Sequence, residues 1–257
     1  MTSFSNPKVS VIILAAGLGT RMRSGKAKVL HELHGRPMIL YVIETAKRVS
    51  GDAVVVVIGN QAEAVRATVS AEHEVLFAHQ EQQLGTGHAV ACAMPYLPTD
   101  IEHTFILCGD VPLLRVETLD RLWVEHRRTR RNLTLLAAQT DTPQGYGRIL
   151  FDADKNVCAI IEEGDATEAQ RRIDVVNTGI YCVDREFLAD SLTKINCQNR
   201  QAELYLTDIV GIGYREGRSV GAIVTPDSDE FIGINSPEDL QRVEAILQTQ
   251  ANHGNIA

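Results

Sequence analysis

The chain has 257 residues, of which 44% are hydrophobic, and a formal net charge of −8 at neutral pH. This length can bury one large core, and an acidic chain is a poor general binder of nucleic acid or anionic membranes. The longest apolar runs, at 9–16 and 53–58, are too short to cross a bilayer. With no recognisable signal peptide at residues 1–10, these features predict a cytoplasmic protein.

The first half alternates short β-branched runs with amphipathic segments. Strands are expected at 8–14, 53–58, 74–78 and 104–107, and helices at 37–49, 61–69, 86–93 and 116–128. Continuous apolar runs of this length are typical of strands that are buried on both faces. The alternation predicts an α/β protein with a doubly wound, mostly parallel sheet.

The second half predicts a more mixed arrangement. Strands are expected at 133–139, 174–183 and 219–225, a hairpin at 148–151 and 157–161, and helices at 185–192, 206–216 and from Ser236-Pro237 to about residue 250. We expect one domain over 1–250, in which a nucleotide-binding half (1–130) and a sugar-binding half (131–250) share a sheet. A frayed tail is expected at 251–257.

The cysteine and histidine residues give little indication of a structural metal site or of disulfide bonds. The cysteine count of five is odd and includes no C-x-x-C pair, so neither a disulfide framework nor a zinc site is expected. His31, His34 and His88 have no metal-binding spacing, and structural roles are expected for them.

A glycine-rich basic loop follows the first strand and extends from Leu14 to Lys28. The small residues that let a ligand approach the backbone closely are Ala15, Ala16 and Gly17. The four bases that follow, with no acid among them, are Arg21, Arg23, Lys26 and Lys28. In an acidic protein, this local reversal of charge suits a loop wrapped around a triphosphate.

Three other interpretations of this loop fit less well. The G-x-x-x-x-G-K-[ST] spacing of a P-loop is absent, and Met22 stands where a dinucleotide fingerprint needs its third glycine. A solvated basic loop would explain the charges. It would not explain their place at the carboxyl end of a buried strand, where open α/β sheets bind ligands.

The loop resembles the sugar-phosphate nucleotidyltransferase signature, L-x-x-G-x-G-T-R-M followed by a lysine. Further segments that match this family in order are 80–89, 109–113, 145–148, 161–162, 176–180, 203–208 and 233–235. The segment 80–89 is similar to the base-binding loop of one branch, the uridylyltransferase part of bifunctional N-acetylglucosamine-1-phosphate uridylyltransferases (GlmU). The resemblance covers about residues 8–250. It implies the Rossmann-like nucleotide-diphospho-sugar transferase fold.

The resemblance also implies an activity: transfer of UMP from UTP to N-acetylglucosamine 1-phosphate, with release of pyrophosphate and with Mg²⁺ as cofactor. The implied catalytic residues are Arg21 and Lys28, and the implied metal ligands are Asp110 and Asn235. The implied nucleotide-binding residues are Leu14, Ala15, Ala16, Gly17, Gln80, Gly85 and Thr86. The implied sugar-binding residues are Cys108, Gly109, Gly147, Glu162 and Asn177, with Tyr205 and Thr207 near the acetamido group.

The residues alone leave several of these roles open. Asp110 could be a turn aspartate bound to backbone, Asn235 could cap the helix that begins near Ser236, and Glu162 could be a surface charge. The amide of Gln80 could rotate to serve either uracil or cytosine. Discrimination between bases is therefore expected from the backbone N–H groups of Gly85 and Thr86.

Departures from the family pattern leave the sugar open. Cys108 stands where a tyrosine is usual, Gly164 where a basic residue is common, and Ala27 where a proline is usual. The hexapeptide repeats of the family's acetyltransferase half are absent from these residues, so we expect no acetyl transfer by this chain. The sequence leaves open a homo-oligomer, and whether the chain stands alone or belongs to a longer protein. Other functions left open are a nucleotidyltransferase for another substrate and an inactive sugar-nucleotide sensor.

Overall fold

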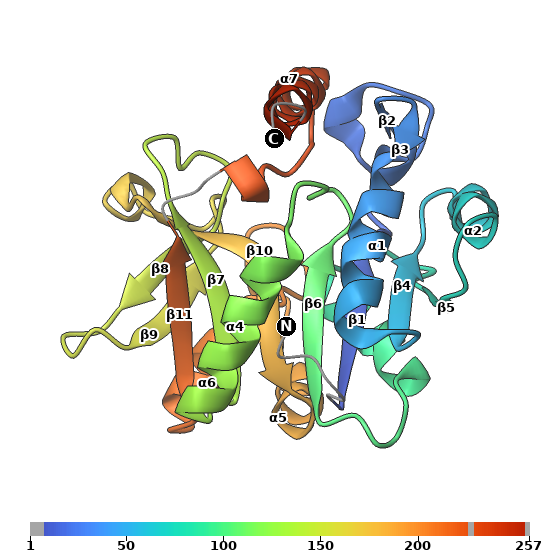
Figure 1. The fold of residues 1–257 in the computed structure, drawn as a ribbon. Helices are drawn as coiled ribbons and strands as arrows, with labels where there is room; N and C mark the ends of the chain where they lie inside the picture. Colours follow the sequence, from blue (N-terminus) through green and yellow to red (C-terminus); the bar gives the residue numbers. More distant parts are fainter. Residues whose placement is uncertain (1–7, 226–228, 255–257) are drawn as a thin grey trace.

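The computed structural model describes residues 8–225 and 229–254, and its largest element is a sheet of nine strands (Figure 1). Seven of them lie side by side in the order β11-β7-β10-β6-β1-β4-β5, while β8 pairs with β10 and β9. The bounds are β1 Val9–Leu14, β4 Val54–Ile58, β5 Leu76–His79, β6 His103–Cys108, β7 Leu133–Gln139, β8 Arg148–Phe151, β9 Val157–Ile161, β10 Val175–Asp184 and β11 Val220–Thr225.

The strand directions confirm a mixed, mostly parallel sheet. The strands β5, β4, β1 and β6 are parallel neighbours, and β11 is parallel to β7. The long strand β10 lies antiparallel between β6 and β7 and therefore joins the two halves of the chain in one sheet. Its register shifts between Asn177 and Tyr181, which lie near the carboxyl end of β6.

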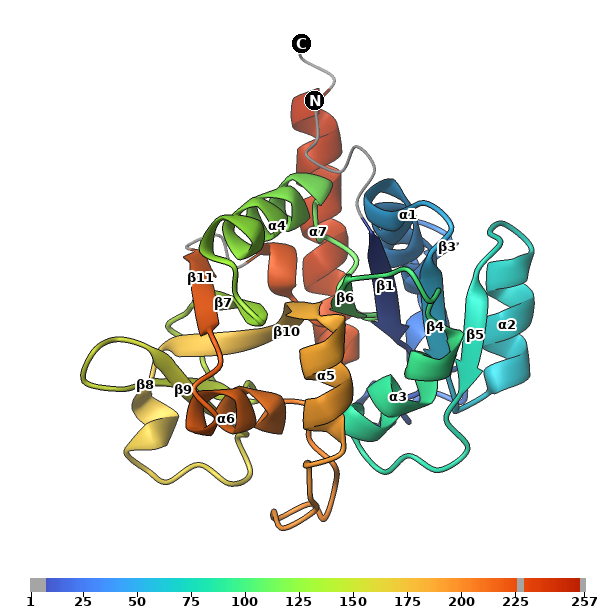
Figure 2. The same ribbon diagram turned by 90° about the horizontal axis from the view of Figure 1, so that it is seen from below.

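Helices cover both faces of the sheet (Figures 1 and 2). Helices α1 (Met38–Ser50) and α4 (Val116–Thr129) lie on one face, and α3 (Thr86–Ala93), α5 (Arg185–Leu192) and α6 (Asp208–Arg215) lie on the other. Alternate residues of β1 point to opposite faces of the sheet, and each face has its own hydrophobic core. Val11 and Ile13 pack in the core under α1, and Ile12 packs in the core under α3. Among the described residues, no helix is long and apolar enough to cross a bilayer.

A further helix packs on the α1 face of the sheet, and a small hairpin and the last helix lie at the carboxyl ends of the parallel strands. Helix α2 (Ala62–Ser70) flanks β4, and α7 (Pro237–Gly254) packs beside a small hairpin of β2 (Glu32–Leu33) and β3 (Arg36–Pro37). The hairpin is not expected from the sequence, because two-residue strands have no recognisable pattern. Helix α7 continues past the expected end at residue 250, and residues 255–257 lie outside the described part.

A histidine pair lies at the opposite end of the strands, where β6 begins, and it consists of the buried His126 and the half-buried His103. His126 of α4 bonds Thr134 Oγ1 through Nδ1 at 2.9 Å and His103 Nδ1 through Nε2 at 3.1 Å. Burial lowers the pKa of His126 from 6.5 to about 3, with a further contribution from the charge of His103. His126 is therefore neutral in the folded protein at neutral pH.

We expect this pair to make the fold sensitive to acid. The unfolded chain binds a proton at residue 126 below about pH 6.5 while the folded chain does not, so stability is lost as the pH falls through this window. Urea unfolding between about pH 7 and 5 should show a loss of up to about 1.4 kcal/mol per pH unit that is absent from His126→Asn. The exposed His79 provides the control: His79→Asn should keep the wild-type slope, and an equal slope in His126→Asn would contradict the prediction.

Candidate active site

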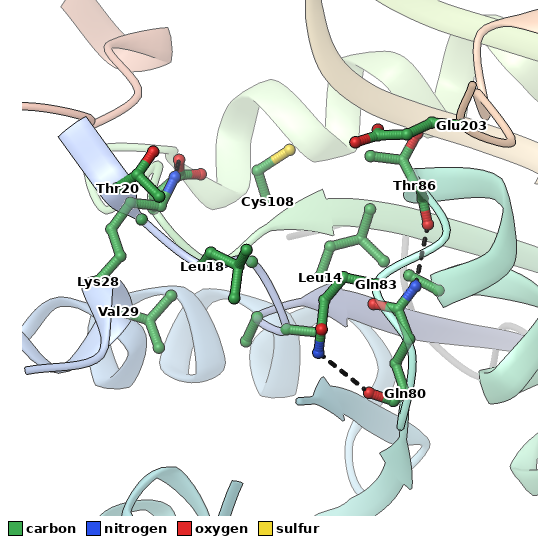
Figure 3. A pocket seen from close by; sticks show the side chains of 17 residues that line it. Leu14, Leu18, Thr20, Lys28, Val29, Gln80, Gln83, Thr86, Cys108 and Glu203 are labelled. Carbon is green, nitrogen blue, oxygen red and sulfur yellow. Dashed lines mark hydrogen bonds and ion pairs between the residues drawn. The ribbon is translucent and has the colours of Figure 1, made fainter. Parts of the chain in front are cut away.

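A pocket of about 420 Å³ opens at the carboxyl ends of β1, β5 and β6 (Figure 3). Lys28 and Thr20 lie at one end, and Gln80, Gln83, Thr86 and Glu203 lie at the other, with Leu14 and Leu18 between them. This position, outside the ends of parallel strands, is where doubly wound sheets bind nucleotides.

All seven residues that the sequence assigns to the nucleotide line this pocket: Leu14, Ala15, Ala16, Gly17, Gln80, Gly85 and Thr86. Lys28, Asp110 and Cys108, which the sequence assigns to catalysis, to the metal and to the sugar, line it as well. The structure adds lining residues for which the sequence indicated no role: Leu18, Gly19, Thr20, Val29, Gln83, Ala89 and Glu203. All but Val29 lie within segments that match the family signature, which is the signal that could have identified them.

The basic loop is held in a compact shape by its own glycine and by a neighbouring glutamine. Gly19 has a φ of 62°, and a Cβ there would lie 2.6 Å from the Cβ of Lys28, so only glycine allows the two ends of the loop to meet. Gln61 accepts from the N–H of Ala27 at 3.2 Å and donates to the carbonyl of Gly25 at 2.6 Å. These bonds direct the Lys28 side chain into the pocket.

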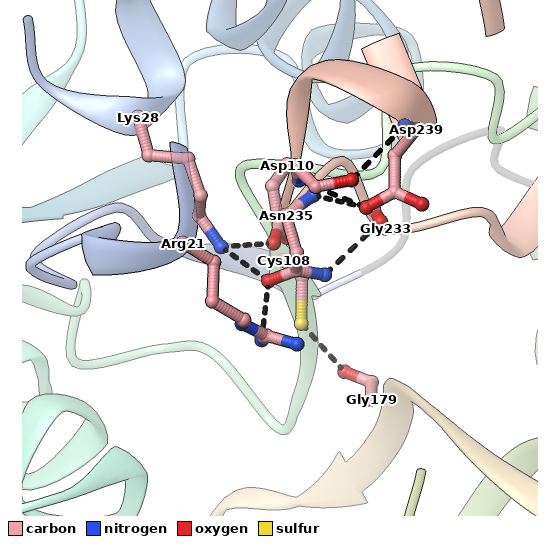
Figure 4. A network of polar contacts seen from close by, with 9 residues as sticks. Arg21, Lys28, Cys108, Asp110, Gly179, Gly233, Asn235 and Asp239 are labelled. Atoms are coloured by element: carbon pink, nitrogen blue, oxygen red, sulfur yellow. Dashed lines mark hydrogen bonds and ion pairs between the residues drawn. The ribbon is translucent and has the colours of Figure 1, made fainter. Parts of the chain in front are cut away.

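Two side-chain oxygens converge on the ammonium of Lys28 (Figure 4). Lys28 forms a short ion pair with Asp110, and its Nζ lies 3.1 Å from Oδ1 of Asn235. Arg21 Nη2 donates to the same Asn235 oxygen at 2.8 Å. The structure thus brings the two expected catalytic residues and the two expected metal ligands together, although they lie in three distant segments.

The structure also bears on the alternative roles of Asp110 and Asn235. The helix that follows Asn235 is capped by others: Asp239 accepts from the N–H of Ser236 at 2.9 Å, and its own N–H donates to Ser236 Oγ at 3.2 Å. The Asn235 side chain faces Lys28 and Arg21 instead. The carboxylate of Asp110, 15% exposed, pairs with Lys28 and not with a turn.

The oxygens of Asp110 and Asn235 fit a small divalent cation. Both are hard donors, and both already face one positive charge, the Lys28 ammonium. Within 8–225 and 229–254, no cluster of three or more His, Cys, Asp or Glu side chains could form a metal cage. Such a two-oxygen set is what Mg²⁺ uses when substrate phosphates and water complete its coordination.

At the other end of the pocket, the amide of Gln80 is fixed rather than free to rotate. Its Nε2 donates to the carbonyl of Gly85 at 3.0 Å and contacts His88 Nδ1 at 3.1 Å, and the side chain is only 3% exposed. Because a carbonyl can only accept, the amide nitrogen must face Gly85 and the amide oxygen must face away. The structure therefore holds the amide in one of the two orientations that the sequence left open.

The segment 203–206 is hydrogen-bonded to the loop that is expected to bind the base. Leu204 accepts from the N–H of Gly87 at 2.8 Å and donates to the carbonyl of Leu84 at 2.7 Å, and the N–H of Leu206 donates to Thr86 Oγ1 at 2.9 Å. Gly85 has a φ of 112°, and a Cβ there would lie 2.6 Å from the Leu204 carbonyl. These bonds therefore require glycine at this position.

The residues assigned to the sugar form a second cluster, next to the pocket. The amide of Asn177 donates to Tyr181 OH at 2.7 Å and accepts from the N–H of Gly179 at 3.1 Å. Glu162 accepts from Thr207 at 2.9 Å, and a Cβ on Gly147 would lie 3.5 Å from the Glu162 carboxylate and 3.6 Å from Asn177.

Cys108 connects this cluster to the nucleotide pocket. It lines the pocket, and its thiol donates to the carbonyl of Gly179 at 3.6 Å. Burial raises the pKa of Cys108 to about 12 and also raises the pKa of Glu162. This shift keeps the Cys108 thiol in its neutral form at physiological pH, which argues against a role as nucleophile.

Two expected site residues, Gly109 and Arg21, lie differently from the rest, and the structure also bears on the unusual Gly164. Gly109 does not line the pocket; its N–H donates to the Leu14 carbonyl at 2.9 Å and brings β1 and β6 close together. Arg21 borders an adjoining pocket of about 460 Å³, which shares Thr20 with the first. Near Gly164, a positive charge comes from another segment, because Arg200 donates to the Gly164 carbonyl at 3.3 Å.

Comparison with known proteins identifies the family of this chain. Residues 11–174 match the family described as MobA-like NTP transferase domain. The chain belongs to this family. The chain is also similar to proteins named bifunctional protein GlmU, with 44% identity to that of Syntrophotalea carbinolica and 40% to that of Desulfotalea psychrophila.

These relatives are longer than the chain. The matches cover 95% of this chain but 52% of the Syntrophotalea protein, and 96% of this chain but 72% of the Desulfotalea protein. Among solved structures, a putative glucose-1-phosphate thymidylyltransferase from Bacillus anthracis in complex with a sucrose has a TM-score of 0.69 at 17% identity. That match covers 93% of this chain and 94% of the other, and it confirms the nucleotidyltransferase fold expected from the sequence.

Proposed function

We propose that this chain transfers the uridylyl group of UTP to N-acetylglucosamine 1-phosphate and releases pyrophosphate. The observation that carries the proposal is the two-ended pocket, in which the amide of Gln80 lies opposite Lys28 and Asp110. Asn235 contacts the Lys28 ammonium beside this second end. A nucleotide fits with its base at the first end and its phosphates at the second. The similarity to GlmU proteins supports the choice of nucleotide and sugar.

In the reaction, an oxygen of the sugar phosphate attacks the α-phosphorus of UTP, and the bond from the α-phosphorus to the oxygen that bridges it to the β-phosphorus breaks. A phosphate monoester is already anionic at neutral pH, so no general base is needed. Lys28 and Arg21 neutralise the charge that develops on the phosphates and on the departing pyrophosphate. The site brings these charges together before substrate binds, which is the main source of catalysis in such reactions.

Asp110 and Asn235 would hold Mg²⁺ in this proposal. When bound, the ion would neutralise phosphate charge and help to align the reacting groups. Lys28 would then turn from the two oxygens to the phosphates, which are the stronger partners for an ammonium.

The sugar would bind in the cluster around Asn177 and Glu162. A carboxylate and an amide suit sugar hydroxyls, which both donate and accept, and Cys108 lies where this cluster meets the nucleotide pocket. Pyrophosphate release in the presence of UTP and N-acetylglucosamine 1-phosphate, compared with other sugar 1-phosphates, is the decisive test. A protein that binds both substrates without turnover would instead be a sensor.

We predict that UTP is the preferred nucleotide, that dTTP keeps measurable activity and that CTP is rejected. The fixed oxygen of Gln80 accepts from the N3–H of uracil or thymine, but cytosine presents a lone pair there. An unpaired buried acceptor costs about 1–3 kcal/mol, or about 5- to 150-fold in kcat/KM. Initial rates with UTP, dTTP, CTP, ATP and GTP measure this order, and a rate with CTP above that with UTP would rule out the assignment of Gln80.

A further inference from the structure

The imidazole of His88 lies behind the side chain that reads the base in the proposed function. His88 follows Thr86 in the first turn of α3, and its Nδ1 contacts the Gln80 amide nitrogen at 3.1 Å. The same amide nitrogen donates to the carbonyl of Gly85 at 3.0 Å. Both hydrogens of the amide group are thus directed to named acceptors.

These contacts determine the tautomer of His88. The Gly85 carbonyl has no hydrogen, so the amide nitrogen must be the donor on that side, and it is a donor toward His88 as well. Nδ1 of His88 must therefore carry the lone pair, which places the imidazole proton on Nε2. Nε2 faces Cys92 Sγ at 3.7 Å, and a thiol sulfur is a weak acceptor for this proton.

The Gly85 carbonyl also accepts from the N–H of Ala89 at 3.1 Å, so its two lone pairs serve two donors. His88 provides the second acceptor. Among the described residues, we find no hydrogen bond to the oxygen of the Gln80 amide, which leaves it for a ligand in the pocket.

We propose that His88 is a specificity-determining positioning residue, whose Nδ1 lone pair keeps the oxygen of Gln80 directed at the nucleotide base. The proposal rests on the proposed function, since it concerns how a uracil base is told from a cytosine base. His88 touches no substrate in this arrangement and acts only through Gln80.

Two substitutions of matched shape separate this role from simple packing. His88→Leu places a methyl group where Nδ1 lies, whereas His88→Asn can place a carbonyl oxygen there. We expect His88→Leu to lower the ratio of CTP to UTP dissociation constants by about 3- to 10-fold, mainly through weaker UTP binding, and His88→Asn to retain the wild-type ratio within about twofold. Cys92→Ala, which removes only the partner of Nε2, should leave the ratio unchanged.

Equilibrium titration with UTP and with CTP measures these ratios without requiring turnover or the correct sugar. An unchanged ratio in His88→Leu, or an equal loss in His88→Asn, would overturn the role of His88 while leaving the uridylyltransferase proposal intact. Equal affinity of the wild-type protein for UTP and CTP would overturn both. A second readout needs no substitution: imidazole nitrogen-15 spectra should show the His88 proton on Nε2, and a proton on Nδ1 would refute the proposal.

Discussion

Replacing Asp110 with alanine is expected to lower the rate of pyrophosphate release by about two to three orders of magnitude, with the fold intact. The substitution removes the only carboxylate that faces Lys28 in the described part of the site and half of the oxygen pair that suits Mg²⁺. The backbone carbonyl of Asp110 accepts from the N–H of Ile234 at 2.9 Å, and this bond does not depend on the side chain. The segment that carries Asn235 should therefore stay in place.

The measurement is the initial rate as a function of Mg²⁺ concentration, with circular dichroism to verify folding. Asp52 gives a matched control, because it also pairs with a lysine, Lys47 at 3.0 Å, but is 93% exposed. Asp52→Ala should retain wild-type activity, since exposed ion pairs contribute little. Activity of Asp110→Ala within about threefold of wild type at every Mg²⁺ concentration would show that the Asp110 carboxylate is not needed for catalysis.

The parts of the fold that the sequence predicts well are those with strong local patterns. The strand at 133–139, the hairpin strands and the helices at 86–93 and 185–192 have the expected bounds, because buried β-branched runs and amphipathic periods are local properties. The position of β10, antiparallel between β6 and β7, is not a local property, because it depends on which edges of the other strands are available for pairing.

Helix α6 begins later than its local pattern indicates. The apolar period predicts a helix from residue 206, but the helix begins at Asp208. The N–H of Leu206 donates to Thr86 Oγ1, on the loop 80–89. The first N–H groups of a helix have no partner within it, and this bond across 120 residues supplies a partner that no pattern within 203–208 could indicate.

In the candidate site, too, local features could be predicted and contacts between distant segments could not. Its residue types could be predicted because they lie in short segments that match a family signature. The orientation of Gln80 could not be, because it results from Gly85 and His88 acting together. The bond between Arg21 and Asn235 likewise joins segments 214 residues apart, whose meeting depends on the packing of α7.

Replacing Lys28 with alanine is the second change with a large expected effect, and the loop provides its own control in Lys26. Lys28 is 17% exposed and reaches two oxygens of the site, Oδ2 of Asp110 and Oδ1 of Asn235. Lys26 is 43% exposed and pairs with Glu32 at 2.8 Å, away from the pocket. The two lysines carry the same charge and lie two residues apart, so they differ mainly in where the loop directs them.

We expect Lys28→Ala to slow pyrophosphate release by about two to three orders of magnitude and Lys26→Ala by less than about threefold. A positive charge held against the phosphates in a partly buried site stabilises the transition state far more than a solvated charge nearby, because water screens the latter. Lys28→Arg, which keeps the charge but not the compact shape of the ammonium, should recover only part of the rate. Rates measured for all three variants at saturating UTP separate the two explanations: comparable losses in Lys26→Ala and Lys28→Ala would mean that the loop acts through its total charge, and the specific role of Lys28 would have to be abandoned.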